Sequence, residues 1–359
     1  MFTEFTVKDF RCFSELRLER LERINLIAGK NNTGKTALFE AIDLHNHPNG
    51  CQLALEMNKL RGVSQPGKAF GEVLSWLFRD KQGEAGLELS STDDNSIKRS
   101  LTLSLLDATT ARERLSEDEK RGVLQLHPDL WAIGSPTLLM RYEQTNEQQR
   151  LSWASPAFQL AGVGMNSCTA RLPWSIGSIY VGSTVSNTDA DAEFFAKLAL
   201  AKREKELLPA LQIMEPRLKT LALLPLAGES VVHGDIGRPN LVPISFMGEG
   251  MRRMLSILLA IANATSGVVL IDEIENGLHY SVQKKVWKAI AQAARQENVQ
   301  VFATTHSYQC IDAAHDAFRE SGSYDFRLFR LDRVDNSVTV TDYDQESLDA
   351  AMKFFMEVR

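Results

Sequence analysis

The sequence predicts an α/β fold built on a central sheet of buried strands. Three segments carry this prediction, because in each an apolar run ends directly at polar residues: 23–29, 267–273 and 301–307. A strand that is apolar at every position suits the middle of a parallel sheet covered on both faces. In open α/β sheets, ligands bind at the carboxyl ends of such strands. The residues that follow each strand are therefore the candidates for function.

The first strand runs into a glycine-rich loop, Gly29-Lys-Asn-Asn-Thr-Gly-Lys-Thr36, and residues 37–42 then read as a helix start. The loop fits G-x-x-x-x-G-K-[ST] in its proper strand–helix context. Its glycines let the backbone curl round a phosphate, and the helix points its positive end at the anion. We expect Lys35 to reach the β- and γ-phosphates and Thr36 to hold Mg²⁺. The predicted nucleotide-binding residues here are Gly29, Lys30, Asn31, Asn32, Thr33, Gly34, Lys35, Thr36 and Ala37.

Polar residues also follow the other two strands. Asp272 is expected to support the Mg²⁺ shell together with Thr36, and Glu273 to polarise the attacking water as general base. His306, at the end of the third strand, can hydrogen-bond the γ-phosphate or the attacking water. The alternative is a strand-end histidine satisfied by backbone. The predicted catalytic residues are Lys35, Glu273 and His306.

Two further motifs lie at informative positions, one before Asp272 and one after Glu273. Phe246-Met-Gly-Glu-Gly250 opens a helix 24 residues before Asp272, and Ile274-Glu-Asn-Gly-Leu-His279 follows Glu273. With Asp9-Phe-Arg-Cys-Phe13 and the segments above, this set resembles the ABC-type ATPases of the SMC, RecF and OLD group. The closest likeness is to OLD-like ATPases, often called AAA family ATPases, and it covers roughly the first 45 and last 150 residues.

The resemblance implies a P-loop NTPase fold of the ABC-ATPase head type, with a mixed central sheet, an antiparallel β lobe and a helical insertion. It also implies a head-to-head dimer with two ATP molecules in its interface. Gly248, Glu249 and Gly250 of one subunit would then face the γ-phosphate bound by Lys35 of the other.

Two residues need comment within this resemblance. The usual signature has a serine before its glycines, whereas this chain has Met247. Backbone N–H groups or Ser245 must therefore replace the serine contact. Arg11 lies where related heads place a basic residue near the nucleotide; the alternative is a surface arginine on an edge strand.

The same resemblance divides the chain into a discontinuous head, residues 1–45 and 175–359, and a lobe with insertion, residues 46–174. The head's first strands are expected at 2–7 and 16–27. Alternating patterns predict hairpins at 87–105, 137–153 and 326–343, with strands near 179–182, 220–224 and 230–234. A helix is expected at 189–214, kinked or divided at Pro209, and another at 345–357. Long SMC-type arms are expected to be absent.

A TOPRIM nuclease domain, which OLD nucleases carry, is also expected to be absent. Only 53 residues follow His306, and such a domain needs roughly twice that length with a series of metal-binding carboxylates. Asp342-Tyr-Asp344 is read as a solvated loop at a hairpin end.

Composition limits the function classes. The chain has 359 residues, 44% of them hydrophobic, and a net charge of −6 from 40 basic and 46 acidic residues. These values describe a globular protein with no overall field that attracts nucleic acid. We find no secretory signal and no apolar stretch that suits a transmembrane helix. The cysteines form no C-x-x-C pair, so reduced thiols and a cytoplasmic location are expected: Cys12, Cys51, Cys168 and Cys310.

We therefore expect an ATPase, slow when isolated, that uses ATP and Mg²⁺ and acts as a switch or scaffold. It would dimerise around ATP and control a separately encoded effector, a nuclease or toxin, in bacterial anti-phage defence. The alternatives are a RecF-like DNA-binding repair ATPase, an ABC transporter ATPase and a catalytically silent nucleotide-binding scaffold. The expected partners are a second copy and the effector, with no membrane, while DNA binding and larger oligomers stay open.

Overall fold

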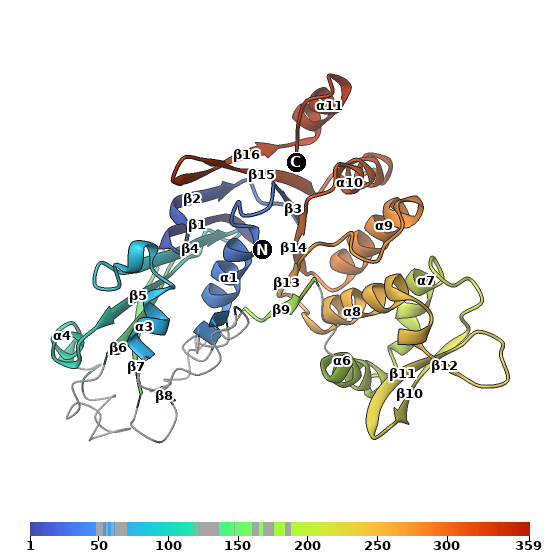
Figure 1. Cartoon of the computed structure of the whole chain (residues 1–359), viewed down its shortest axis with the longest axis horizontal. Helices are drawn as coiled ribbons and strands as arrows, with labels where there is room; N and C mark the ends of the chain where they lie inside the picture. The colour runs from blue at the N-terminus through green and yellow to red at the C-terminus, as the bar shows by residue number, and fades with distance from the viewer. Residues whose placement is uncertain are drawn as a thin grey trace.

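The computed structural model describes residues 1–47, 53–54, 57–58, 61, 70–117, 120, 136–146, 148–159, 165–167, 176–183 and 188–359. Within them the strands form three sheets of seven, six and three strands (Figure 1). Among these residues no helix is both long and apolar enough to cross a membrane.

The six-stranded sheet is the central sheet predicted from the three apolar runs. Its order is β16-β15-β3-β14-β13-β9, and all its strands are parallel except β16 at one edge. The mixed sheet is thus confirmed, as is the hairpin predicted at 326–343, whose two-residue turn is Asp335-Asn336. Its strands are β3 (Ile24–Ala28), β9 (Ser178–Val181), β13 (Val268–Ile271), β14 (Gln300–Thr305), β15 (Phe326–Val334) and β16 (Ser337–Tyr343).

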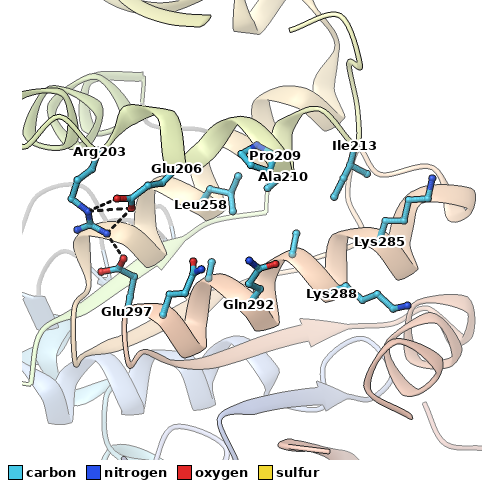
Figure 2. A pocket seen from close by; sticks show the side chains of 13 residues that line it. Arg203, Glu206, Pro209, Ala210, Ile213, Leu258, Lys285, Lys288, Gln292 and Glu297 are labelled. Carbon is cyan, nitrogen blue, oxygen red and sulfur yellow. Dashed lines mark hydrogen bonds and ion pairs between the residues drawn. The ribbon is translucent and has the colours of Figure 1, made fainter. Parts of the chain in front are cut away.

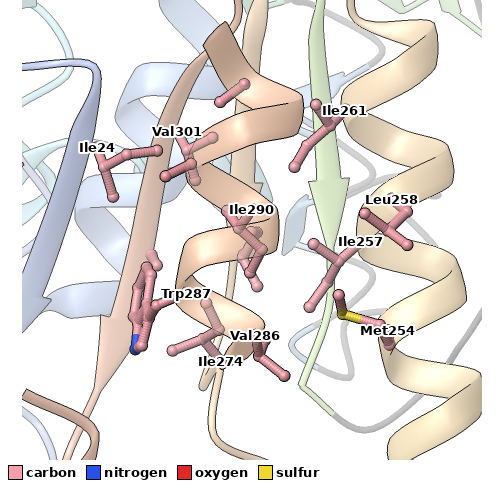
Figure 3. Close-up of a cluster of buried hydrophobic side chains, with 14 of the residues drawn as sticks. Ile24, Met254, Ile257, Leu258, Ile261, Ile274, Val286, Trp287, Ile290 and Val301 are labelled. Carbon is pink, nitrogen blue, oxygen red and sulfur yellow. The ribbon is translucent and has the colours of Figure 1, made fainter. Parts of the chain in front are cut away.

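Alternate side chains of the central strands enter two different cores. In β13, Val268 and Leu270 face α1 (Lys35–Asn46), whereas Val269 and Ile271 face the helices on the other side. This division follows from the period of two along a strand, and it explains why β13 is apolar at every position. The helices on the far side are α6 (Thr188–Leu200), α8 (Glu249–Asn263), α9 (Tyr280–Gln296) and α10 (Tyr308–Glu320). Figure 3 shows side chains of α8 and α9 meeting above the sheet.

The seven-stranded sheet is antiparallel throughout, in the order β2-β1-β4-β5-β6-β7-β8. Both hairpins predicted in this part are present. Short helices α3 (Phe70–Ser75) and α4 (Ala108–Glu113) and the 3₁₀ turn η1 (Arg79–Lys81) accompany the sheet. Its strands are β1 (Phe2–Phe10), β2 (Phe13–Glu19), β4 (Leu87–Asp93), β5 (Lys98–Leu106), β6 (Thr137–Thr145), β7 (Arg150–Gln159) and β8 (Met165–Ser167).

Strands form at both expected ranges, 2–7 and 16–27, but the second divides into β2 and β3, and the three strands do not all join the central sheet. Only β3 joins that sheet, while β1 and β2 pair with each other and with β4. The physical reason is the apolar face of β1, since Phe5 and Val7 are fully buried in the core that contains α1. Helix α1 thus lies between the two sheets (Figure 1). The division of the chain at residues 45 and 175 stays a prediction.

The helix expected over 189–214 breaks before its proline. Helix α6 ends at Leu200, Lys202 has a φ of 57°, and Pro209 lies in the first turn of α7 (Leu208–Leu211) after η3 (Glu204–Leu207). Proline is tolerated there because the first N–H groups of a helix lack partners within the helix. The next three strands form the smallest sheet: β10 (Thr220–Leu226), β11 (Glu229–Asp235) and β12 (Val242–Pro243).

The last helix, α11 (Gln345–Lys353), ends four residues before the expected Glu357. Reading Asp342-Tyr-Asp344 as a solvated loop is also wrong in part. Asp342 forms ion pairs with Arg20 and Arg327, and the Asp344 carboxylate accepts the Ser347 N–H and so caps α11. The two carboxylates therefore have structural partners.

Candidate functional site

The carboxyl ends of three neighbouring strands meet at one edge of the central sheet. In register, Thr305 of β14 lies beside Ala28 of β3, and Ile271 of β13 lies beside Ala303. The residues that follow these strands therefore come together, and we call residues 29–36, 272–275 and 304–306 the strand-end site. All the predicted catalytic residues belong to it.

The glycine-rich loop has a backbone that only glycine accommodates at two positions. Gly29 and Gly34 have φ values of 150° and 98°. A Cβ on Gly29 would lie 2.6 Å from the Leu331 carbonyl oxygen, and one on Gly34 would lie 2.8 Å from the Phe13 ring. Gly34 is the N-cap of α1 and no side chain caps this helix end. The positive end of α1 is thus left to an anion, as a phosphate loop requires.

Lys35 lies over the loop with its ammonium group held by two carbonyls. Its Nζ donates to the oxygens of Gly29, at 2.6 Å, and Lys30, at 2.9 Å. An ammonium group has three donors, so one N–H remains for a phosphate oxygen. Burial lowers the pKa of Lys35, while the negative charges of Asp272 and Glu273 oppose this shift. That opposition reflects how near the carboxylates lie to the ammonium group.

Asp272 has both carboxylate oxygens held by hydroxyl groups. Thr304 donates to Oδ1 at 2.6 Å, and Tyr180 donates to Oδ2 at 3.2 Å. The Asp272 carbonyl oxygen accepts from the buried guanidinium of Arg253, which comes from α8. Burial lowers the pKa of Arg253, and Asp272 raises it. Strands β9 and β14 thus fix the orientation of the Asp272 carboxylate, and helix α8 holds the backbone of the same residue.

Glu273 has an unusual backbone conformation, with a φ of 46°. This left-handed region is strained for a residue other than glycine. The conformation is held by a bond of 2.7 Å from its N–H to Thr304 Oγ1, and Asn276 donates to Glu273 Oε2 at 2.7 Å. The single hydroxyl of Thr304 therefore connects Asp272 and Glu273.

His306 is half exposed and faces two carboxylates. Its Nδ1 lies 3.4 Å from Glu275 Oε1 and 3.9 Å from Glu273 Oε1. Its backbone N–H donates to Glu275 Oε1 at 3.0 Å. The sequence alternative, a strand-end histidine satisfied by backbone, is not what the structure shows, because its ring faces side-chain carboxylates.

The donor set at this edge suits Mg²⁺, which prefers carboxylate and hydroxyl oxygens and keeps several waters. Thr36 is exposed at the start of α1, and Asp272 supplies an oriented carboxylate. Among the described residues, no group of three or more His, Cys, Asp or Glu side chains is placed to hold a metal ion. Thr36 and Asp272 are the residues that would hold it here.

The loop Met247–Gly250 precedes α8 and contacts the segment after Glu273. A Cβ on Gly250 would lie 2.6 Å from the Gly277 carbonyl oxygen, and one on Gly277 would lie 2.7 Å from Glu249 Cγ. Gly248 is the N-cap of α8, with a φ of 115° and nothing within 4 Å of its Cβ position. The two segments quoted for the resemblance thus pack against each other, with Gly250 buried between them, and we call Gly248–Gly250 together with Gly277 the glycine surface.

Comparison with known proteins agrees with this geometry. The family model described as an AAA ATPase domain matches residues 190–311, a stretch that contains α8, Asp272, Glu273 and His306. An ATP/GTP phosphatase of Helicobacter pylori is 21% identical over 369 residues and covers 97% of both chains. An uncharacterized protein of Methanocaldococcus jannaschii is 32% identical over 113 residues, 90% of that protein and 32% of this chain. The chain therefore carries an AAA ATPase domain.

A solved structure supports the same fold. An SMC head bound to the C-terminal winged-helix domain of ScpA covers 98% of the ATPase chain, with a TM-score of 0.50 and 14% identity. The ABC-type head fold predicted from the motifs is therefore confirmed.

Arg11 of the ATPase is not a surface arginine on an edge strand. It lies in the turn between β1 and β2, and its Nε is 2.6 Å from Glu40 Oε2 of α1. Asn58 accepts from its guanidinium at 3.4 Å. Burial lowers its pKa, with Glu40 opposing. Arg11 thus has a structural ion pair, and its predicted contact with nucleotide stays a prediction.

Met247 takes a place in the core. The Met247 Cε lies 2.9 Å from the Cβ position of Gly234, so the side chain packs against β11. Its packing leaves backbone N–H groups at the start of α8, and Ser245 is exposed nearby.

Sequence reasoning missed four residues of the site. Thr304 and Glu275 lie inside the motifs, but nothing in the pattern indicates which atoms they contact. Tyr180 occurs in a strand recognised only for its apolar run. Arg253 gives one signal, a charge within the apolar residues of a helix, and its role depends on where β13 ends.

The ATPase also has a hollow of about 750 Å³ outside the strand-end site, between α7, α8 and α9 (Figure 2). Apolar residues such as Pro209, Ile213 and Leu258 line one part of it. Arg203 forms ion pairs with Glu206 and Glu297 at one end. No residue of the strand-end site lines this hollow.

Proposed function

We propose that this ATPase hydrolyses ATP at composite sites formed when two copies meet head to head. The strand-end site of one copy would bind the nucleotide, and the glycine surface of the other would complete it. The observation that carries this proposal is the convergence of Lys35, Asp272, Glu273 and His306 at one sheet edge, beside a helix start that no side chain caps.

Each side chain has a task that fits its contacts. The free N–H of Lys35 would bind a phosphate oxygen, and Glu273 would accept a proton from the attacking water. His306 would hydrogen-bond the γ-phosphate or that water. Thr36 and Asp272 would hold Mg²⁺, which when bound neutralises charge on the phosphate oxygens.

Dimerisation around ATP is supported by the glycine surface. The start of α8 presents a positive helix end and open space at Gly248. Two aromatic side chains flank this surface, Phe246 at 75% and Tyr280 at 66% exposure. Exposed apolar groups beside a polar site are typical of interaction surfaces. A second copy would cover them while bringing the glycine surface to the phosphate.

We further propose that the dimer controls a separately encoded effector, such as a nuclease, in anti-phage defence. Its support is the resemblance of the motifs to OLD-like ATPases. The SMC head of similar fold, bound to a domain of ScpA, illustrates an ATPase head with a separate partner.

The test is Glu273→Gln, which preserves shape and removes the general base. We expect ATP turnover to fall at least about 100-fold and an ATP-bound dimer to accumulate with Mg²⁺ and ATP, measured by light scattering. Lys35→Ala is the control, because it removes the phosphate contact and should stay monomeric under the same conditions. Equal ATP turnover in the variant and the wild type would contradict the role of Glu273 as general base. A variant that binds ATP yet stays monomeric would refute the dimer.

The same two variants test the effector. We expect a host protein to co-purify with the Glu273→Gln variant and not with the Lys35→Ala variant. Equal recovery of all host proteins with both variants would contradict control by the ATP-bound dimer.

A further inference from the structure

Glu275 is a nearly buried carboxylate beside the reacting groups, and no motif assigns it a role. Its side chain is only 9% exposed. Oε1 accepts from the Thr305 hydroxyl at 2.8 Å and from the His306 N–H at 3.0 Å. Oε2 is buried and, within the described part of the chain, has no hydrogen-bond partner. Burying a carboxylate is costly unless its charge is paired and hydrogen-bonded. We therefore expect the partners of Glu275 to indicate what the residue does.

The third group at Oε1 is the ring of His306. Nδ1 lies 3.4 Å from that oxygen, whereas Glu273 Oε1 is 3.9 Å away. A carboxylate beside one ring nitrogen of a histidine favours the proton on that nitrogen and fixes the orientation of the ring. With the Nδ1 proton directed at Glu275, Nε2 is the nitrogen left for a nucleotide or water.

We propose that Glu275 is a positioning residue that sets the orientation and tautomer of His306. It acts through the imidazole and does not touch the substrate. This inference rests on the proposed ATP hydrolysis and on the role of His306 in it. The Thr305 hydroxyl and the His306 backbone N–H donate to one oxygen of Glu275, and the His306 ring nitrogen Nδ1 lies 3.4 Å from that same oxygen.

Glu275 also belongs to the segment that ends in the glycine surface. The Leu278 N–H donates to the Glu275 carbonyl oxygen at 3.0 Å, and Gly277, between them, contacts the Glu249 side chain. The residue that orients His306 is therefore two positions from the surface that would meet the second copy. Dimerisation and the orientation of His306 share one short turn.

A double-mutant cycle in ATP turnover tests the proposal on the full chain. Glu275→Ala should lower kcat about 10- to 100-fold, with KM for ATP changed less than about twofold. In the His306→Ala background the same substitution should change nothing further, because its effect passes through the imidazole. A purely structural role for Glu275 would not depend on the imidazole in this way.

Two conservative variants separate position from charge. Glu275→Gln keeps an oxygen at the same reach for the two donors and for the His306 ring, so kcat should stay within about threefold of wild type. Glu275→Asp keeps the charge but withdraws the oxygen from Nδ1, so kcat should fall, and again only when His306 is present. This pair also carries the test if Glu275→Ala does not fold, as judged by thermal melting. Glu297→Gln, a carboxylate change beside the distant hollow, is the matched control.

The outcomes are distinguishable. If Glu275→Ala lowers kcat equally with and without His306, or if Glu275→Ala turns over like wild type while His306→Ala is impaired, Glu275 does not act through His306 and the inference is overturned. If His306→Ala itself turns over like wild type, the proposed role of His306 fails, and the inference fails with its premise.

Discussion

Removing the Thr304 hydroxyl should disconnect the Asp272 carboxylate from the Glu273 backbone in the strand-end site. Thr304 is fully buried, and its Oγ1 donates to Asp272 Oδ1 at 2.6 Å and accepts the Glu273 N–H at 2.7 Å. In Thr304→Val a methyl group of similar size replaces the hydroxyl, so no cavity forms. Both hydrogen bonds are lost, and the Glu273 N–H is left without its acceptor.

The magnitude follows from these two bonds. An orphaned buried N–H costs about 1–3 kcal/mol, and a hydrogen bond to a charged group is worth about 1.5–3 kcal/mol. Asp272 is only partly buried, so water replaces part of the hydrogen-bond energy that its carboxylate loses. We expect a loss of about 2–4 kcal/mol in the free energy of unfolding. In a chain of this size that corresponds to a fall of about 3–5 °C in Tm.

The effect on catalysis should be larger than the effect on stability suggests. The strained conformation of Glu273, with a φ of 46°, loses the bond that holds it. A displacement near 1 Å can cost about 100-fold in rate, so kcat for ATP should fall about 10- to 100-fold. Steady-state phosphate release and thermal melting measure the two effects on one preparation.

Thr304→Ser is the matched control, because it keeps the hydroxyl and removes only a methyl group, at about 1 kcal/mol. Its turnover should stay near wild type. If Thr304→Val melts and turns over like Thr304→Ser, the hydroxyl does not hold the Asp272 carboxylate and the Glu273 backbone, and the reasoning is wrong.

Two further predictions concern other parts of the ATPase. In Gly250→Ala the new Cβ would lie 2.6 Å from the Gly277 carbonyl oxygen, so ATP binding to the monomer should persist while ATP-dependent dimerisation and turnover are lost; wild-type dimerisation in light scattering would contradict this. Burial raises the pKa of Asp191 from 3.8 to about 6, with the Ser256 hydroxyl opposing. The folded state then binds the proton more tightly, so stability is lost as pH rises from about 4 to 6. Asp191→Asn should therefore stabilise the protein by up to about 2 kcal/mol at pH 7.5 and by little near pH 4, and an equal shift in Tm at both values would refute the assignment.

The sequence could predict those parts of the site that depend on local chain geometry. Residues 29–36 have their glycine spacing, the strand before and the helix after all within one short stretch, so the loop is readable without the rest of the fold. The apolar runs before Asp272 and His306 likewise predict strands, since burial on both faces leaves a local pattern. These strands are β13 and β14, and they lie beside β3 in the central sheet.

Pairing between distant segments could not be predicted in this way. Strand β1 joins the antiparallel sheet instead of the central one because its partner is β4, about 80 residues away in the chain. Its alternation of buried residues indicates a strand covered on one face, but it does not indicate which strand it pairs with. The break before Pro209 was similarly hidden, because Lys202 shows no local signal for its left-handed conformation.

By itself, the sequence determined the class of the fold and indicated the candidate catalytic residues, because a phosphate loop and strand-end carboxylates are local patterns. Only the tertiary structure decided what holds those groups. Thr304, Tyr180 and Arg253 reach Asp272 from three different elements, and Glu275 meets His306 across two loops. Such contacts depend on strand register and helix packing, which bring together residues up to about 90 positions apart, and no local pattern records them.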